Sequence, residues 1–398
     1  MHRGVFVRVP GARNGSAAVA RIPPAARLRQ NRPMRVCLSM IVKNESAVIE
    51  RCLRSVLPHI DSWAISDTGS TDGTQDIVRR VLADKPGELI ERPWVDFAHN
   101  RNEALNLARR HGELALVIDA DEILQVADDA GKPDPQLPGQ MFEYLFGVTR
   151  YWRVCIVRLD RDWRWEGVLH EVLVSAQAAQ VTKLRGWQIR TFADGARSQQ
   201  PDHVKYGRDA EVLRKALERE PNHARHAFYY AQSLRDAGQS AESLIAYRRR
   251  VDLGGWDEEV YFAKLQIALL LERTGASYAD IGAAYLDACD FRASRPEAPC
   301  EFARYLRLQQ RYRMASVFAR IALEQPVSGD VLFVDSAVKA WRAKDELAVA
   351  SWYCGDGALS ARLCEELLSD GELPASEQVR VETNLRFAEQ LRDGKPNG

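Results

Sequence analysis

Apolar runs of strand length alternate with amphipathic segments over residues 34–125. Strands are predicted at residues 36–42, 63–67, 88–92 and 114–119. Between them, apolar side chains recur at helical spacing, and Asn44, a favourable N-cap residue, is expected to begin the first helix. Further helices are predicted after Thr74 and over residues 102–110. This alternation is typical of an α/β fold with a Rossmann-like, mostly parallel sheet.

The pattern changes in the second half of the chain. Residues 141–147, 151–159, 167–175 and 184–192 are predicted as further strands, and from His203 onward the periodicity is helical. The predicted helices cover residues 206–220, 224–237, 241–253, 258–274, 278–293, 301–309, 312–324, 332–343, 347–355 and 358–368, and the array ends near residue 390. Residues 229–247 resemble a tetratricopeptide (TPR) unit, in which small Ala231 and Ala246 allow close helix contact. An all-α, TPR-like solenoid is therefore predicted.

Three regions follow from these patterns: a basic leader over residues 1–33, an α/β domain over 34–198 and an α-helical repeat domain over 199–398. The leader contains seven arginines and no acidic residue. It is interpreted as a disordered leader, an over-long start before Met34 or an organelle transit peptide. Because the net charge of the whole chain is zero, the remainder is mildly acidic, which argues against a nucleic-acid partner.

The cysteine content and the apolar runs indicate the compartment. The seven cysteines are odd in number, contain no Cys-x-x-Cys motif and lie mostly in apolar periodic segments, as expected of free thiols in a reducing environment. No run approaches the ~20 apolar residues that span a bilayer. The predicted location is the cytoplasm, with peripheral attachment to a membrane left open.

Two aspartates at the end of the fourth predicted strand supply the first candidate chemistry. Asp119 and Asp121 are one residue apart, so their side chains can face the same way where the strand ends. Ligands of open α/β sheets bind at the carboxyl ends of strands, and paired carboxylates there suit a divalent cation carrying phosphate oxygens. The loop with Gly69 and Gly73 precedes a helix and suits an anion, although Gly-x-Gly-x-x-Gly and Walker motifs are absent from the sequence.

Four motifs in order resemble the family-2 glycosyltransferases, which have the GT-A fold. They are Ser-Met-Ile-Val-Lys-Asn-Glu at residues 39–45, Asp-Thr-Gly-Ser-Thr-Asp-Gly-Thr at 67–74, Trp-x-Asp-Phe-x-x-x-Arg-Asn at 94–102 and Asp-Ala-Asp-Glu at 119–122. Their spelling is similar to a bacterial branch that includes transferases with TPR-like helices and S-glycosyltransferases of bacteriocin peptides. The resemblance covers residues 34–195 and identifies 34–198 as a GT-A domain.

The resemblance implies roles for the donor site. Asn44, Glu45 and Asp67 would hold the nucleoside, with Asp67 on the base and Gly69 in the adjoining loop. Arg101 would reach the base or the diphosphate. UDP is favoured as the donor nucleotide by analogy with the family.

The resemblance also implies a metal site for Mn²⁺ or Mg²⁺. Asp119 would lie near the ribose and the metal, and Asp121 would coordinate the cation bridging the diphosphate. His170, in a Gly-x-x-His-Glu motif, would be a third metal or diphosphate contact. The cation would neutralise charge on the departing diphosphate.

The catalytic base is the weakest match to the family. An inverting transferase needs a base for the acceptor proton, and many family-2 enzymes supply it from a Glu-Asp pair that is absent between residues 125 and 195. Glu171 is the first candidate and Glu166 the second. If side chains alternate along a strand, Glu171 faces away from His170.

These residues predict a metal-dependent, inverting glycosyltransferase of the hexosyltransferase type. The acceptor is a glycan, a lipid-linked sugar or a peptide. The helical domain would hold that acceptor, bind a protein partner or a second copy, or brace the catalytic domain. One alternative is a non-catalytic TPR-type interaction protein with a relic sugar-nucleotide domain. Nucleotidyl transfer is a further alternative. It is disfavoured because the sequence has no Gly-rich phosphate loop bearing Lys or Arg near its first strand.

Overall fold

The computed structural model describes residues 34–177, 180–192, 194–196 and 200–394. These residues form two compact units. The first comprises the described chain up to Phe146 together with Trp152–Ala216, and the second comprises Gly147–Tyr151 and the chain from Leu217 onward. The predicted leader, residues 1–33, lies outside the described residues, and the predicted boundary at 198 stays a prediction.

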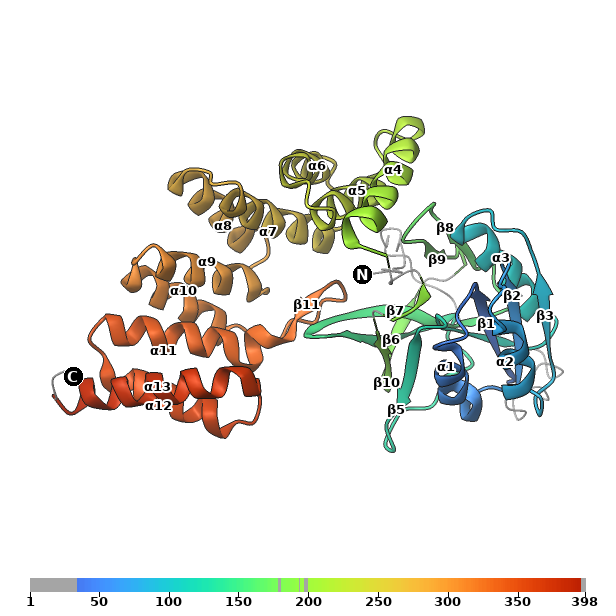
Figure 1. Ribbon diagram of the computed structural model, residues 1–398, viewed down its shortest axis with the longest axis horizontal. Coiled ribbons are helices and arrows are strands. Elements are labelled where there is room, and N and C mark those ends of the chain that lie inside the picture. Colours follow the sequence, from blue (N-terminus) through green and yellow to red (C-terminus); the bar gives the residue numbers. More distant parts are fainter. Residues whose placement is uncertain (1–33, 178–179, 193, 197–199, 395–398) are drawn as a thin grey trace, which may run out of the picture. The chain divides into compact units, whose positions relative to one another are not determined.

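A mixed sheet forms the centre of the first unit (Figure 1). Within the described residues its strand order is β3-β2-β1-β4-β7-β6-β10-β5. The strands are β1 (Val36–Val42), β2 (Ser62–Asp67), β3 (Gly87–Glu91), β4 (Leu114–Val117), β5 (Glu122–Val126), β6 (Gly139–Phe146), β7 (Thr149–Arg158) and β10 (Val181–Thr191). Strands β3, β2, β1 and β4 are parallel, β7 is antiparallel to β4, and β10 is parallel to β6. The predicted α/β, GT-A-like fold class is confirmed.

Helices α1 (Ile49–Val56), α2 (Thr74–Val81) and α3 (Phe97–Ala108) follow the first three strands. Helix α3 packs against β1 and β2, and α1 packs against α2 and β5. The prediction that Asn44 caps α1 is wrong, because Val48 occupies the N-cap position. Helix α3 starts before the predicted residue 102 because the Asp96 side chain caps it, accepting a hydrogen bond from His99 N at 2.7 Å. The sheet also has β5, which was not predicted.

The second unit is a run of helices in which each packs on the next (Figure 1). Helix α4 (Asp202–Arg219) leads into it, and the unit contains α5 (Ala224–Asp236), α6 (Ser240–Asp252), α7 (Asp257–Arg273), α8 (Tyr278–Phe291), α9 (Glu297–Leu308), α10 (Tyr312–Glu324), α11 (Ala343–Tyr353), α12 (Gly357–Ser369) and α13 (Ala375–Arg392). The predicted all-α second half is confirmed. The predicted helix at 332–343 begins later, at residue 336, because the short strand β11 (Val334–Asp335) precedes it; a π-helical turn, Val338–Arg342, then continues it into α11.

The tip of the β6–β7 hairpin belongs to the second unit. Strand β11 pairs antiparallel with Thr149 and Arg150 at this tip. The Ser336 hydroxyl donates to Val148 O at 2.7 Å, and the rings of Tyr151 and Phe333 lie 5.8 Å apart, edge to face. The second unit therefore combines helices with a segment that the sequence assigned to the sheet.

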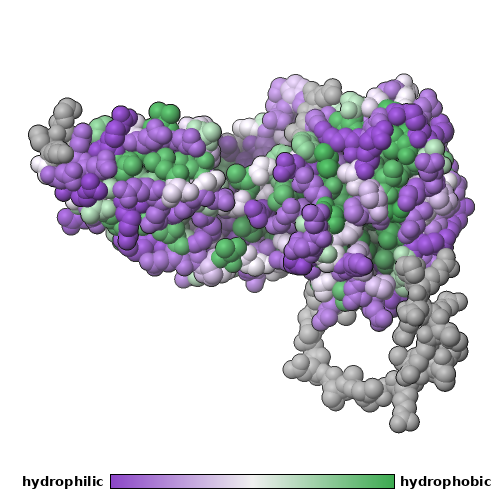
Figure 2. Space-filling model, turned by 90° about the horizontal axis from the view of Figure 1, so that it is seen from below, coloured by the Kyte–Doolittle hydropathy of each residue, from purple (hydrophilic) through white to green (hydrophobic). Residues whose placement is uncertain are grey.

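The face shown in Figure 2 carries hydrophilic side chains interspersed with hydrophobic ones. Among the described residues, no helix combines the length and apolar character that crossing a membrane requires. All seven cysteines are free thiols.

Candidate active site

Two loops at the carboxyl ends of β1 and β2 are tied to each other. Residues 44–46 follow β1 and residues 68–74 precede α2. Four hydrogen bonds of 2.8 to 2.9 Å link them: Thr71 N to Asn44 Oδ1, Asn44 N to Ser70 Oγ, Glu45 N to Thr74 Oγ1 and Ser46 N to Asp72 Oδ2. Asn44 adopts a left-handed backbone with φ 53°, which Asn tolerates better than most residues. The Asn-Glu motif and the Gly-containing motif thus form one structural element.

Asp67 ends β2 and is fully buried. Its Oδ1 accepts hydrogen bonds from Gly69 N and Ser70 N, both at 2.8 Å, and the φ of 101° at Gly69 makes this turn possible. Its Oδ2 has no hydrogen-bond partner among the described residues. Buried polar atoms are almost always partnered in folded proteins. The second oxygen of Asp67 is therefore suited to accept a hydrogen bond from a bound ligand.

Asp119 and Glu171 are joined by one arginine. Arg101, on α3, donates from Nη2 to Asp119 Oδ1 at 2.5 Å and from Nε to Glu171 Oε1 at 2.6 Å. All three side chains are buried, and the guanidinium lies over the ring of Trp165 with 4.9 Å to its centroid. Taking ions out of water is expensive unless partners are close, so this cluster depends on all three charges being present.

A second buried carboxyl, Glu122, lies beside Asp119. Its Oε2 accepts from Asp119 N at 2.9 Å, and its Oε1 lies 3.3 Å from Arg153 Nη1. Burial and the neighbouring Asp119 charge raise the pKa of Glu122 to about 8, although Arg153 opposes the shift. The side chain of Tyr144 completes the surroundings of Arg153, whose guanidinium lies 4.5 Å from the ring centroid.

Sequence reasoning missed Glu122 and Arg153 as site residues. Glu122 lies within the quoted Asp-Ala-Asp-Glu motif, so its position carried a signal. No sequence pattern indicates Arg153. Its Nη1 lies 3.8 Å from Asp119 Oδ2, but the two residues are far apart in the chain.

Asp121 lies against a short segment, residues 194–196, that follows β10. A Cβ built on Gly195 would come within 2.7 Å of Asp121 Oδ2. Arg51, on α1, pairs with Asp194 at 2.7 and 2.9 Å and donates to Asp121 O at 3.4 Å. Ala196 N donates to Glu45 Oε2 at 3.2 Å, so this segment also meets the first loop.

The remaining predicted residues are spread around this site. His170, half-buried and with a left-handed φ of 52°, lies between β8 (Arg164–Glu166) and β9 (Val172–Val174). Glu166 is about half exposed and pairs with Arg164 at 2.5 Å. Within the described part of the chain, Asp119, Asp121 and His170 do not form a group of ligand atoms lying within 4.8 Å of one another. Of the predicted set, Arg101, Asp119 and Glu171 are brought together directly.

The donor chemistry near Asp121 fits a hard divalent cation. Carboxylate oxygens are the ligands that Mg²⁺ prefers, and Mn²⁺ accepts the same oxygen donors. The Asp121 carboxylate is only partly buried, whereas Asp119 is committed to Arg101. If a cation binds here, Asp121 would be its first ligand.

Comparison with known proteins finds a family match within the first unit. Residues 37–129 match the family model described as Glycosyl transferase family 2. A TPR repeat-containing protein of Synechococcus elongatus is 31% identical over 199 residues, covering 46% of this chain and 47% of its own length. An uncharacterized glycosyltransferase of Rickettsia felis is 23% identical over 242 residues, covering 56% of this chain and 78% of its own. The chain thus spans about half the length of the first of these relatives.

Similar solved structures include BtubC from P. vanneervenii and S. aureus TarS. BtubC is 14% identical, with a TM-score of 0.38, and the match covers 52% of this chain and 96% of BtubC. TarS is 14% identical, with a TM-score of 0.29, and the match covers 64% of this chain and 54% of TarS.

Proposed function

We propose that this chain, whose residues 37–129 form a glycosyl transferase family 2 domain, moves a sugar from a nucleotide-sugar donor to an acceptor. The observation that carries the proposal is the buried cluster of Arg101, Asp119 and Glu171. Asp119 of this cluster is two residues before Asp121 in the sequence. It lies beyond the carboxyl end of β4, the neighbour of β1 in the sheet. In open α/β sheets, ligands bind at this edge.

The nucleoside of the donor is assigned to Asp67 and the loops beside it. The buried Oδ2 of Asp67 would accept a hydrogen bond from the base, because its Oδ1 is already occupied by Gly69 and Ser70. Asn44 and Glu45 would act mainly by holding the loop that contains Gly69. Recognition by a carboxylate requires an N–H donor on the base, which uracil, thymine and guanine offer from the ring and cytosine offers from its amino group, so this contact alone does not select the nucleotide. UDP remains the favoured nucleotide by analogy with the family.

The diphosphate is assigned to Asp121 and a bound Mn²⁺ or Mg²⁺, with His170 as a further contact. When bound, such an ion supplies charge neutralisation as the diphosphate leaves. Arg101 would orient Asp119 through their ion pair.

An inverting reaction requires a base for the acceptor hydroxyl or thiol, and the two candidates differ in their surroundings. Glu171 is buried and has one oxygen bound to Arg101. Glu166 is about half exposed and accessible to an acceptor. Turnover of Glu166→Gln and Glu171→Gln, each measured with donor binding, separates the assignments. The base variant loses turnover and keeps donor affinity, whereas loss of donor affinity indicates a positioning role.

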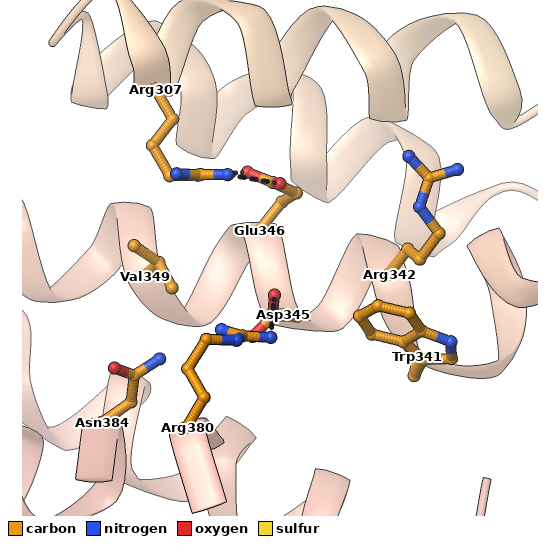
Figure 3. Close-up of a pocket in the computed structure, with 8 residues that line it drawn as sticks. All are labelled: Arg307, Trp341, Arg342, Asp345, Glu346, Val349, Arg380 and Asn384. Carbon is orange, nitrogen blue, oxygen red and sulfur yellow. Dashed lines mark hydrogen bonds and ion pairs between the residues drawn. The ribbon is translucent and has the colours of Figure 1, made fainter. Parts of the chain in front are cut away.

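The alternative function, partner binding by the helical unit, has a specific feature in its favour. A cavity of about 390 Å³ lies among α9, α11 and α13 in that unit (Figure 3). Arg307 pairs with Glu346 at 2.6 Å on one side, and Arg380 pairs with Asp345 at 3.0 Å on another, with Trp341 beside them. A recess lined by several charged side chains suits a peptide or glycan better than a lipid chain.

Thermal stability against UDP, GDP, CDP and dTDP, each with and without Mn²⁺, tests the proposal. A ligand that binds only the folded state raises its melting temperature. The expected result is a shift with one diphosphate, dependent on the metal and lost in Asp121→Ala. The matched control, Asp76→Ala, removes an exposed acid of α2 and should leave the shift intact. If a folded sample shows no shift with any of the four, the relic alternative is favoured.

A further inference from the structure

A histidine–carboxylate cluster lies at the junction of α4 and α5, within the second unit. Glu220 directly follows the last residue of α4, His223 is the N-cap residue of α5, and His226 lies in the first turn of α5. Among the described residues, these three form the group of metal-ligating side chains whose candidate ligand atoms all lie within 4.8 Å of one another.

The imidazole of His226 lacks the partners that a buried ring normally has. Only 6% of the residue is exposed, and neither ring nitrogen has a hydrogen-bond partner within the described chain. Its Nδ1 lies 4.0 Å from Glu220 Oε2, which is too far for a hydrogen bond. Because buried polar groups are almost always satisfied, this ring is suited to a ligand that the protein itself does not provide.

His223 and Glu220 surround the open side of this ring. The two imidazole rings are stacked, with centroids 3.7 Å apart and planes inclined by 20°. His223 Nδ1 accepts a hydrogen bond from His226 N at 3.1 Å. The Glu220 side chain is 63% exposed, so a solvated ion can reach it. Arg225, the residue before His226, is paired with Glu259 at 3.0 Å, which reduces its repulsion of a cation.

We propose that Glu220, His223 and His226 bind a divalent transition-metal ion, with Zn²⁺ as the expected occupant. Two imidazoles and one carboxylate suit Zn²⁺, Co²⁺ or Ni²⁺, whereas Mg²⁺ and Mn²⁺ prefer oxygen ligands. Three protein ligands leave the fourth tetrahedral position to water. The ion would tie the end of α4 to the start of α5.

The required adjustments are small on the exposed side. With metal–ligand bonds of about 2.0–2.2 Å, tetrahedral ligand atoms lie about 3.4 Å apart. The exposed Glu220 can close the 4.0 Å gap to His226 by a change of rotamer. His223 must turn out of its stack and give up its capping bond, because a neutral ring cannot accept at one nitrogen and bind a metal at the other. Metal binding therefore replaces a weak cap with a stronger link.

Isothermal titration of the full chain with ZnCl₂, without nucleotide, tests the site. The expected result is one bound Zn²⁺ per chain and a raised melting temperature. Glu220→Gln should weaken binding by about tenfold or more, and the double variant His223→Gln/His226→Gln should abolish it. His203→Gln, which changes an exposed histidine of α4, and Asp121→Ala should both retain the Zn²⁺ site.

Two results would overturn the proposal. One is a folded Glu220→Gln chain that binds Zn²⁺ as tightly as the wild type. Because Glu220 is exposed, this variant should fold normally, which its metal-free melting temperature checks. The other is loss of the Zn²⁺ site in Asp121→Ala, which would assign the ion to the sugar-nucleotide site. Neither result depends on transferase activity, so the proposed Zn²⁺ site and the proposed glycosyltransferase function can be overturned independently.

Discussion

Arg101 is the residue on which the buried part of the candidate site depends most. It holds Asp119 and Glu171, which lie 18 and 70 residues away in the sequence. The family motif located Arg101 and Asp119, but neither spacing nor periodicity indicates that Glu171 returns to the same guanidinium. Sequence reasoning treated Glu171 as a free base because contacts of this kind are determined by tertiary packing alone.

The first prediction concerns this cluster. Arg101→Ala removes the guanidinium that two buried carboxylates share and should lower the free energy of unfolding by about 3–5 kcal/mol. Glu171→Gln should cost less, since Arg101 keeps Asp119. Urea denaturation measures both variants. Arg54→Ala, which breaks an exposed pair with Glu50, is the control and should change stability little. Equal losses in Arg101→Ala and Arg54→Ala would show that the buried pairs do not form.

The second prediction concerns Gly195. An alanine Cβ there would lie 2.7 Å from Asp121 Oδ2, so either the carboxylate or the 194–196 segment must shift. Gly195→Ala should weaken Mn²⁺-dependent nucleotide binding by about tenfold, a differential free energy of about 1.4 kcal/mol. Titration calorimetry measures it. Gly207→Ala, at a helical glycine with open space around it, should leave the affinity unchanged. If Gly195→Ala bound the nucleotide with wild-type affinity, residues 194–196 would not be part of the nucleotide site.

At the scale of elements, the alternating strands and helices of the first half and the helical second half followed from hydrophobic periodicity, whereas several element ends did not. Asn44 has the chemistry of a cap but instead accepts from Thr71 N, because the neighbouring loop offers a competing donor. Asp96 begins α3 earlier than apolar spacing indicated. Strand β11 takes the place of the first residues of a predicted helix, since pairing with β7 overrides local helical preference there.

The third prediction concerns the link between the two loops. Burial opposes ionisation of Asp72, but hydrogen bonds from Thr74 and Ser46 outweigh it and lower its pKa to about 2, from an ordinary 3.8. A carboxyl with a lower pKa in the folded state stabilises the fold above its ordinary pKa, and this stabilisation is lost as the pH falls through about 2. Melting temperatures of wild type and Asp72→Asn should therefore differ at neutral pH and converge as the pH falls from about 4 to about 2. A difference in melting temperature that does not change with pH would contradict the proposed contribution of Asp72.

At the scale of the whole molecule, the sequence separates a sheet from a helical array, but the chain does not divide at one point. Residues 147–151 of the β6–β7 hairpin belong to the helical unit. The local sequence pattern does not indicate that the hairpin tip belongs to the helical unit, because the pattern is that of an ordinary turn between two strands. Only its partners, Val334 of β11 and the ring of Phe333, reveal where it belongs.

The last prediction follows from that arrangement. A fragment ending at residue 216 keeps the hairpin but loses β11 and Phe333, which exposes Tyr151, only 1% exposed in the full chain, and leaves Arg150 without its strand partner. A newly exposed strand edge and an exposed apolar ring favour aggregation. The fragment should therefore melt at a lower temperature than the full chain and aggregate, as circular dichroism and light scattering would show. Restoring solubility by replacing Tyr151 and Val148 with Ser in the fragment would assign the defect to the hairpin tip. A wild-type fragment that stays soluble and melts cooperatively at the temperature of the full chain would instead mean that the hairpin is stable without the helical unit.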